Sequence, residues 1–193
     1  LQQTFPEHEL LGEEELTGSV DAEHLWIIDP LDGTTNFVHD FPAWCMSVAL
    51  QHGEQTVLGV VWDVPRNEVF SAVRGQGACR NGQAILVSAP KKLQDSLLGI
   101  GFPYAGFDRL SDYMAVAQRV LESSHGLRRM GAAALDLAWV ACGRLDGFYE
   151  IGLKAWDVGA GALLVQEAGG SVSDFRGTDN FVFGRNIAAS NGN

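Results

Sequence analysis

The sequence predicts an α+β first part followed by an α/β second part. Apolar runs of strand length, separated by short turns, dominate the first half of the 193 residues. In the second half, similar runs alternate with stretches of helical spacing, a pattern typical of helices packed against a sheet. Hydrophobic residues make up 46% of the chain, enough to bury a sizeable core.

The first half contains short apolar runs bounded by glycine, proline and asparagine. Residues 1–18 are acidic and rich in turn formers, so we expect irregular structure there. Strands are expected at residues 25–28, 43–51, 55–63, 68–73 and 84–88, with a glycine-rich turn at residues 75–82. A short helix is expected at residues 36–39, where the hydroxyl of Thr34 or Thr35 is placed to cap it.

The second half alternates strands with helices. Leu110, Met114, Ala117 and Leu121 recur at helical spacing and predict a helix over residues 110–123. A buried helix is expected at residues 132–142, closed by Gly143, and another at residues 157–168, ended by Gly169 and Gly170. Strands are expected at residues 97–101, 147–151, 171–174 and 186–190. We place a boundary between the two parts near residues 89–93.

The charge and cysteine content narrow the class of protein. The chain has 13 Lys and Arg against 24 Asp and Glu, a formal net charge of -11, which argues against a nucleic-acid-binding surface. Cys45, Cys79 and Cys142 are widely spaced and form no C-x-x-C pattern, so we expect reduced thiols and a cytoplasmic protein. We see neither an apolar run of membrane-spanning length nor a signal-peptide pattern.

An acidic turn, Asp29-Pro30-Leu31-Asp32-Gly33-Thr34-Thr35, follows the apolar run Trp26-Ile27-Ile28. Proline favours an extended conformation for the residue before it, and glycine permits a sharp turn, so both carboxylates can point into one small space. Two carboxylates about 4 Å apart repel each other by roughly 4 kcal/mol at an effective dielectric of 20. Such a site holds a proton or a hard cation such as Mg²⁺ or Mn²⁺. The alternative is an ordinary Asx-rich turn.

Three further acidic residues are candidates for the same site, and each has a structural alternative. Glu13 belongs to a run of three glutamates that would equally serve as a solvated charge run, and Glu150 would equally be a surface charge. Asp157 begins an apolar helix and would equally be its N-cap. No cysteine or histidine is placed as a nucleophile: His8, His39 and His52 are expected at the surface or in turns, and His24 and His125 give no clearer signal.

The sequence resembles the inositol monophosphatase family at several motifs that occur in the family's order. Residues 26–37 (WIIDPLDGTTNF) resemble its first signature, and residues 155–161 with 167–170 resemble its second. Residues 10–14 match the acidic segment that precedes the first signature, and residues 75–82 match the glycine-rich hairpin between the two. The likeness covers nearly the whole chain. Residues 128–157 look most like the bacterial inositol-1-monophosphatase branch.

The resemblance implies a role for individual residues. It implies metal ligation by Glu13, Asp29, the carbonyl of Leu31, Asp32 and Asp157, with two or three Mg²⁺ ions, Mn²⁺ as a substitute, and Ca²⁺ or Li⁺ as inhibitors. It implies that Glu13 and Thr34 hold the attacking water, and that Asp29 bridges the metals. It implies substrate contacts for Asp32, Gly33, Thr34, Thr35, Gly131, Ala132, Ala133, Glu150 and Asp157.

The resemblance also implies an architecture, a layered α-β sandwich of the sugar-phosphatase type that is often a homodimer. Residues 1–90 would form a metal-binding α+β part with an antiparallel sheet, and residues 91–193 an α/β part that completes the active site. The chain would lack the family's first helix pair, whose aspartate supports the contact of Thr34 with water, and a final strand and helix. We therefore expect a chain truncated at both ends. Ala155 stands where the family often has Pro or Cys, and Ala132 where it often has Ser or Thr.

The leading hypothesis is a Mg²⁺-dependent phosphomonoesterase that hydrolyses inositol 1-phosphate or a similar phosphorylated polyol. Within the same family, histidinol phosphate, a sugar phosphate or a nucleotide phosphate are alternative substrates, because the residues that face the phosphate read only the shared group. A different alternative is a relative that acts through protein partners in the transcription machinery. We expect neither direct nucleic-acid contact nor a membrane partner.

Overall fold

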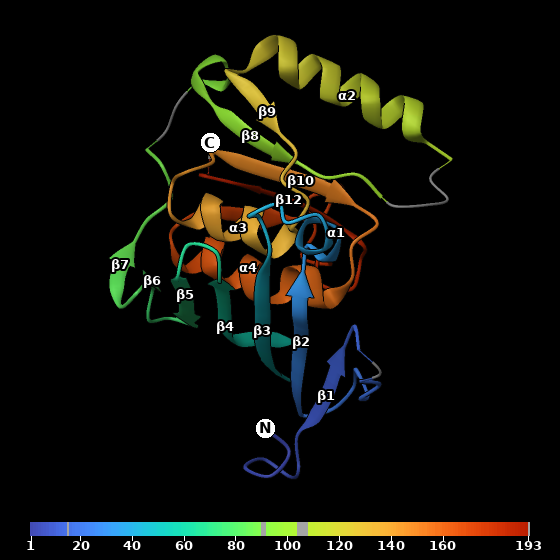
Figure 1. The fold of residues 1–193 in the computed structure, drawn as a ribbon, viewed down its shortest axis with the longest axis vertical. Helices are drawn as coiled ribbons and strands as arrows, with labels where there is room; N and C mark the ends of the chain where they lie inside the picture. The colour runs from blue at the N-terminus through green and yellow to red at the C-terminus, as the bar shows by residue number, and fades with distance from the viewer. Residues whose placement is uncertain (15, 90–91, 104–107, 193) are drawn as a thin grey trace.

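The computed structural model describes residues 1–14, 16–89, 92–103 and 108–192. Within these ranges a seven-stranded sheet and a five-stranded sheet lie on either side of two central helices, α3 (Ala133–Ala141) and α4 (Ala155–Glu167) (Figure 1). Both helices contact strands of both sheets. This layering of sheet, helices and sheet confirms the predicted fold class.

The first sheet follows the order of the chain. Its strands are β1 (Glu9–Gly12), β2 (His24–Asp32), β3 (Cys45–His52), β4 (Gln55–Asp63), β5 (Glu68–Val73), β6 (Ala78–Arg80) and β7 (Gln83–Ile85). Among the described strands of this sheet, only the pairing of β1 with β2 is parallel. β4 and β5 have the predicted bounds. The expectations of irregular structure at β1 and of a turn at β6 were wrong, because these short segments owe their strand conformation to pairing with a neighbour rather than to an apolar run.

The second sheet has the strand order β11-β12-β10-β8-β9. Its members are β8 (Leu97–Ile100), β9 (Gly126–Arg128), β10 (Gly147–Ile151), β11 (Ser171–Ser173) and β12 (Asn186–Ser190). A helix, α2 (Leu110–Ser123), has the predicted bounds and leads into β9, which the sequence did not predict. β8 pairs in parallel with both β9 and β10, whereas β12 runs antiparallel to β10 and β11.

The central helices are buried because small and apolar residues predominate on every side of them. Glycines allow a close approach there: a Cβ added at Gly161 of α4 would lie 2.5 Å from the Cβ of Leu137 on α3. A Cβ at Gly59 of β4 would similarly lie 2.8 Å from the carbonyl oxygen of Ala160. Small residues at these positions let α4 lie against both α3 and the first sheet.

Two short helices complete the structure, α1 (Thr34–Val38) and a 3-10 turn at Leu93–Asp95. The expected capping of α1 by Thr34 or Thr35 was wrong. The helix begins at Thr34 itself, after Gly33, whose φ of 87° is left-handed, and no side chain caps it. The Thr34 hydroxyl instead donates a hydrogen bond backwards to the carbonyl oxygen of Leu31 at 3.0 Å.

The segment between the two sheets is only partly described. Residues 90 and 91, inside the boundary predicted at residues 89–93, lie outside the described residues. None of the helices in the described part of the chain is both long enough and apolar enough to span a bilayer.

Candidate metal centre

Three carboxylates from distant segments converge between the end of β2 and the start of α4. Asp29, Asp32 and Asp157 each offer an oxygen, and these oxygens all lie within 4.8 Å of one another. Asp29 is 2% exposed and Asp32 is 8% exposed, while Asp157 is half-buried. Three acidic groups so close together and so poorly hydrated repel one another unless protons or cations are present.

Backbone N–H groups orient all three carboxylates. The N–H of Leu31 donates to Asp29 Oδ1 at 2.9 Å, and the N–H of Ala134 donates to Asp32 Oδ2 at 2.8 Å. The pairing of β2 with β3 is irregular between Asp29 and Asp32, which allows both side chains to turn toward the cluster. The thiol of Cys45 donates to the same oxygen of Asp32 at 3.6 Å.

Asp157 lies in the first turn of α4 rather than at its N-cap, which is Lys154. The N–H of Lys154 donates to Asp157 Oδ2 at 2.7 Å, so the carboxylate satisfies a backbone donor at the start of the helix. The alternative raised by the sequence, an N-cap aspartate, was therefore wrong in position, although Asp157 does help to satisfy the start of the helix while belonging to the acidic cluster.

The electrostatics of the cluster favour protonation in the metal-free chain. Burial raises the pKa of Asp29 to about 7, and the charges of Glu13 and Asp157 add to the effect. Burial also raises the pKa of Asp157 to about 6 and holds that of Asp32 well above its usual range. The cluster consists of carboxylate oxygens, which hard divalent cations prefer, so the residues present fit a Mg²⁺-type ion.

Glu13 reaches the edge of this cluster through the first strand. β1 pairs in parallel with β2, and the pairing of Gly12 with Ile28 brings Glu13 level with Asp29. Glu13 is exposed, and the 4.8 Å group found among the described residues does not include it. Its charge nevertheless raises the pKa values of both Asp29 and Asp157, so it lies within electrostatic reach of the centre.

The starts of two helices adjoin the carboxylates. A Cβ at Gly33, which precedes α1, would lie 3.1 Å from the Cβ of Ala132, which precedes α3. Asn36 joins the two segments, because its Nδ2 donates to the carbonyl oxygens of Ala43 at 2.6 Å and Met130 at 2.7 Å. The residues around these two starts, Gly33, Thr34, Thr35, Gly131, Ala132 and Ala133, thus lie in one neighbourhood; Thr34 and Thr35 are exposed and Ala132 and Ala133 are buried.

Glu150 is a buried carboxylate on β10, and Gly101 accommodates it. Burial raises the pKa of Glu150 to about 8, and the charge of Asp157 adds to the effect. A Cβ at Gly101 would overlap the Glu150 carboxylate, so only glycine at position 101 permits this side-chain position. Sequence reasoning missed Gly101, because no local pattern connects it with a strand 49 positions away.

Asp136 is a second residue that sequence reasoning missed. It lies on α3, is 1% exposed, and its Oδ1 has no hydrogen-bond partner among the described residues. Burial holds its pKa well above the usual range, and the charges of Glu150 and Asp32 act in the same direction. A signal was present in the sequence: Asp136 is the one charged residue in the run AAALDLAWVA.

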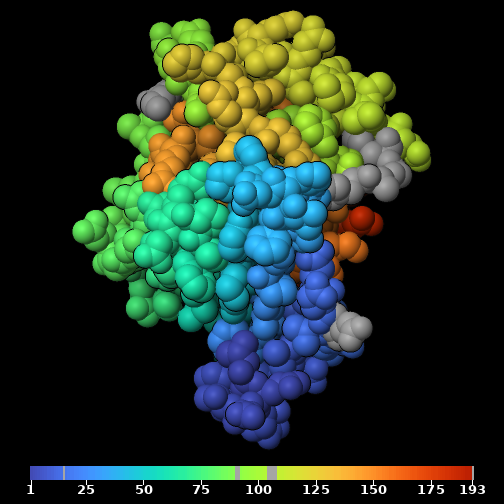
Figure 2. All heavy atoms as spheres, viewed as in Figure 1, coloured from blue at the N-terminus to red at the C-terminus, as the bar shows by residue number. Residues whose placement is uncertain are grey.

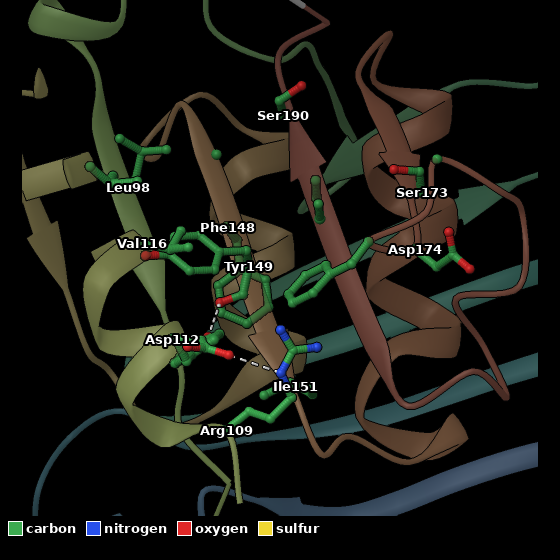
Figure 3. Close-up of a pocket in the computed structure, with 17 residues that line it drawn as sticks. Leu98, Arg109, Asp112, Val116, Phe148, Tyr149, Ile151, Ser173, Asp174 and Ser190 are labelled. Carbon is green, nitrogen blue, oxygen red and sulfur yellow. Dashed lines mark hydrogen bonds and ion pairs between the residues drawn. The ribbon is translucent and has the colours of Figure 1, made fainter. Parts of the chain in front are cut away.

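A separate groove lies between α2 and the strands β10 and β12 (Figure 3). It has a volume of about 680 Å³, and most of its walls are apolar side chains such as Val116, Phe148 and Tyr149. Arg109 and Asp112 form an ion pair at 3.0 Å beside it. The groove shares no residue with the carboxylate cluster, so we do not regard it as the metal centre.

Comparison with known proteins adds evidence to this geometry. A family model described as the inositol monophosphatase family matches residues 1–193. A Pseudomonas aeruginosa protein named Nus factor SuhB is 47% identical over 196 residues, covering 99% of this chain and 72% of that protein. The inositol-1-monophosphatase of Mesorhizobium japonicum is 43% identical over 171 residues, covering 89% of this chain and 64% of that protein. The solved structure of inositol monophosphatase from Anabaena (Nostoc) sp. matches with a TM-score of 0.92 at 43% identity, covering 99% of this chain and 76% of that one.

Proposed function

The chain belongs to the inositol monophosphatase family, and on this premise we propose that it hydrolyses a small phosphate monoester, with inositol 1-phosphate as the leading substrate. The observation that carries the proposal is the convergence of Asp29, Asp32 and Asp157 within 4.8 Å, beside Glu13. A phosphate monoester is a dianion, which the net charge of -11 would repel. Cations at this cluster would reverse the field locally.

The metal ligands we propose are Glu13, Asp29, the carbonyl oxygen of Leu31, Asp32 and Asp157, for two or three Mg²⁺ ions or Mn²⁺ in their place. When bound, such ions lower the pKa of water and neutralise charge on the phosphate and the leaving oxygen. Ca²⁺ and Li⁺ would inhibit by occupying the same oxygens. Calorimetric titration of Mg²⁺ into wild type and Asp157→Asn tests the assignment, and identical binding curves would remove Asp157 from the ligand set.

The residues around the cluster would position water and phosphate. The Thr34 hydroxyl proton is directed at the carbonyl of Leu31, so the hydroxyl oxygen remains able to accept a hydrogen bond from the attacking water. Glu13 would hold that water from the opposite side. The backbone amides of Gly33, Thr34 and Thr35 would bind phosphate oxygens. Phosphoryl transfer asks little covalent chemistry of a protein, so this positioning would supply most of the protein's contribution.

The polyol would lie toward the second sheet. Glu150 is buried, and the charge of Asp157 raises the pKa of Glu150, so the two carboxylates share one electrostatic environment. Its oxygens would accept hydrogen bonds from substrate hydroxyls, while Gly131, Ala132 and Ala133 would line the neighbouring wall. Ala132 brings a methyl group to this wall rather than a hydroxyl, which leaves Glu150 as the main polar contact proposed for the polyol.

A substrate panel tests the proposal. Inositol 1-phosphate, histidinol phosphate, a sugar phosphate and a nucleoside monophosphate would be compared in excess Mg²⁺, with Asp157→Asn as the inactive variant and the exposed His125→Ala as a matched control. Highest kcat/KM on inositol 1-phosphate would support the leading substrate. Faster hydrolysis of histidinol phosphate would replace it, and absence of hydrolysis throughout would reject the phosphatase activity.

A second candidate function is association with a protein partner in the transcription machinery. The observation favouring it is the 47% identity with a protein named Nus factor SuhB. The two functions separate genetically: an Asp32→Asn variant that loses phosphatase activity yet keeps full cellular function would show that the partner role is the essential one. Loss of both together would favour the enzyme.

We also propose that the protein is a homodimer in the cytoplasm. Cys45, Cys79 and Cys142 are unpaired in the structure, and free thiols are typical of a reducing compartment. Light scattering on the purified chain would test the dimer, since a single monomeric mass over a range of concentrations would contradict it. Fractionation of cells followed by immunodetection would test the location.

A further inference from the structure

Four aromatic rings form a column at the end of the first sheet that is remote from the carboxylates. Successive ring centroids lie 4.9 Å apart for Phe5 and His8, 4.5 Å for His8 and His24, and 4.7 Å for His24 and His52. In Figure 1 this is the lower end of β2, near the N-terminus, and in Figure 2 the dark blue N-terminal residues project there. His24 and Asp29 are five positions apart on β2, roughly 16 Å at the rise of a strand.

Two of these histidines form a cross-strand pair. His24 of β2 lies directly opposite His52 of β3 in the antiparallel register, a relationship that holds the two Cβ atoms about 4.5–5.5 Å apart. Leu25 and Ile27, which follow His24 along β2, face the core, so His24 points to the other face of the sheet. The sheet itself therefore keeps these two imidazoles next to each other.

Glu23 completes the group. Its carbonyl oxygen accepts a hydrogen bond from the N–H of Gly53 at 2.8 Å, which fixes its backbone beside His52. Its carboxylate Oε1 lies 3.7 Å from His52 Nε2. Glu23, His24 and His52 each offer a ligand atom, and the three atoms lie within 4.8 Å of one another.

His8 has a different part in the column. Its Nδ1 accepts a hydrogen bond from Trp26 Nε1 at 3.0 Å, so the lone pair of that nitrogen is already used. The ring stacks on His24 at an interplanar angle of only 7° and holds it between His8 and His52. His8 thus positions His24 and is not one of the three ligand-bearing residues.

We propose that Glu23, His24 and His52 form a binding site for one divalent transition-metal ion, best suited to Zn²⁺. Two imidazoles and a carboxylate are a ligand set that zinc prefers and that Mg²⁺, which demands hard oxygen ligands, does not. This site is separate from the carboxylate centre in both ligand chemistry and position, and it does not depend on the proposed phosphatase activity.

The geometry requires only side-chain rotation to close on an ion. Zinc at about 2.0–2.1 Å from two nitrogens in a tetrahedral arrangement needs them about 3.3 Å apart, somewhat less than the present 4.8 Å limit. The side chains of His52 and Glu23 are 57% and 80% exposed, so His52 can turn out of its stack on His24 toward the ion, while the stack with His8 still holds His24. Solvent would supply the fourth ligand. A bound ion would fasten the strand ends of β2 and β3 to each other.

Competition against a chromophoric zinc chelator, in excess Mg²⁺ to keep the carboxylate centre occupied, tests the site. We expect His24→Ala and His52→Ala to weaken Zn²⁺ binding by at least about tenfold. Even the loss of a residue that only hydrogen-bonds to a metal ligand typically weakens binding by that much. His125→Ala, an exposed histidine elsewhere, should bind as wild type. His8→Ala should weaken binding far less than His52→Ala. Near-UV circular dichroism of each variant checks that the fold is kept. The variant His52→Gln removes the imidazole but keeps a polar side chain of similar size.

Two results would overturn the proposal. One is unchanged zinc affinity in both His24→Ala and His52→Ala. The other is loss of zinc in Asp157→Asn but not in His52→Ala, which would place the ion at the carboxylate centre. Imidazole nitrogen chemical shifts give a direct readout as well, because Zn²⁺ should shift the resonances of His24 and His52 and leave those of His125 in place.

Discussion

Asp32 Oδ2 accepts the backbone N–H of Ala134 at 2.8 Å, across 102 residues of sequence. The bond joins the end of β2 to the first turn of α3, so the first sheet and the central helices meet at one carboxylate. It also fixes the direction of that carboxylate before any ligand arrives. Preorganised charged groups of this kind account for much of the rate enhancement of enzymes, because no reorganisation is needed during the reaction.

Asp32→Asn separates the charge of this residue from its structural bond. Asparagine keeps an acceptor oxygen for the N–H of Ala134 but loses the negative charge, so we expect the fold to persist and kcat to fall at least about a hundredfold. Steady-state kinetics in Mg²⁺ and thermal unfolding without metal would measure the two effects. Asp112→Asn, an exposed carboxylate on α2, is the control and should leave both unchanged. Retained activity in Asp32→Asn would contradict the role of its charge.

Gly101→Ala tests the position of Glu150. The φ of Gly101 is not left-handed, so alanine is allowed by the backbone, and the three atoms nearest the new Cβ would all belong to the Glu150 carboxylate. A buried polar group left without its hydrogen-bond partner costs about 1–3 kcal/mol, so we expect KM for inositol 1-phosphate to rise about tenfold. Hydrolysis of p-nitrophenyl phosphate, which has no polyol, should change little.

The double variant supplies the control for this prediction. If Gly101 acts through Glu150, Glu150→Ala combined with Gly101→Ala should be no worse than Glu150→Ala alone. Additive losses in KM would show that Gly101 matters for another reason. Equal losses on both substrates would argue that the change disturbs the whole centre rather than the polyol side.

The raised pKa values predict how pH affects the metal-free chain. The folded-state pKa of Asp157, about 6, lies above its ordinary 3.8, so the folded state binds the proton more tightly than the unfolded state does. The stabilisation is present below the ordinary pKa and is lost as pH rises through about 6. Asp29, with a pKa of about 7, acts in the same direction. The free energy of unfolding without metal should therefore fall between pH 5 and pH 8.

A difference measurement isolates this effect from other titrations. Denaturant unfolding at pH 5 and pH 8 would be compared for wild type and Asp157→Asn, both in a chelator. The fall in the free energy of unfolding from pH 5 to pH 8 should be smaller in the variant, by on the order of 1 kcal/mol after allowance for partial solvent exposure. Excess Mg²⁺ should remove the wild-type decline, because the cation replaces the proton. An equal decline in the two proteins would mean that Asp157 is not perturbed by burial.

Gly161→Ala tests the packing of the central helices. Alanine favours a helix over glycine by about 1 kcal/mol, yet its Cβ would lie 2.5 Å from the Cβ of Leu137. Overpacking costs typically 1–3 kcal/mol, so we expect a net loss in the free energy of unfolding. Gly159→Ala on the same helix is the matched control: its Cβ would lie 3.3 Å from that of Ala49, and the variant should be less destabilised. A more stable Gly161→Ala would show that α3 and α4 can move apart.

The sequence by itself predicted the fold class and many of the elements. The spacing of apolar residues and the length of each apolar run were enough to predict α2, β4, β5, β10 and β12 with their observed bounds. They sufficed because these segments carry strong local patterns: alternating or continuous apolar residues between turn formers. Asp29 and Asp32 were chosen from chemistry alone, since two carboxylates flanking a proline turn at the end of an apolar strand form an unusual local arrangement.

Only the tertiary structure decided what lies beside these residues. The parallel pairing of β1 brings Glu13 level with Asp29, and the proximity of Gly101 to Glu150 depends on how β8 joins β10. His24 and His52, one left without a role by the sequence and the other assigned to the surface or a turn, are brought next to each other by the register of β2 and β3. Register and packing arise from contacts between residues far apart in the sequence. The local pattern of apolar and polar residues does not specify which strands will pair.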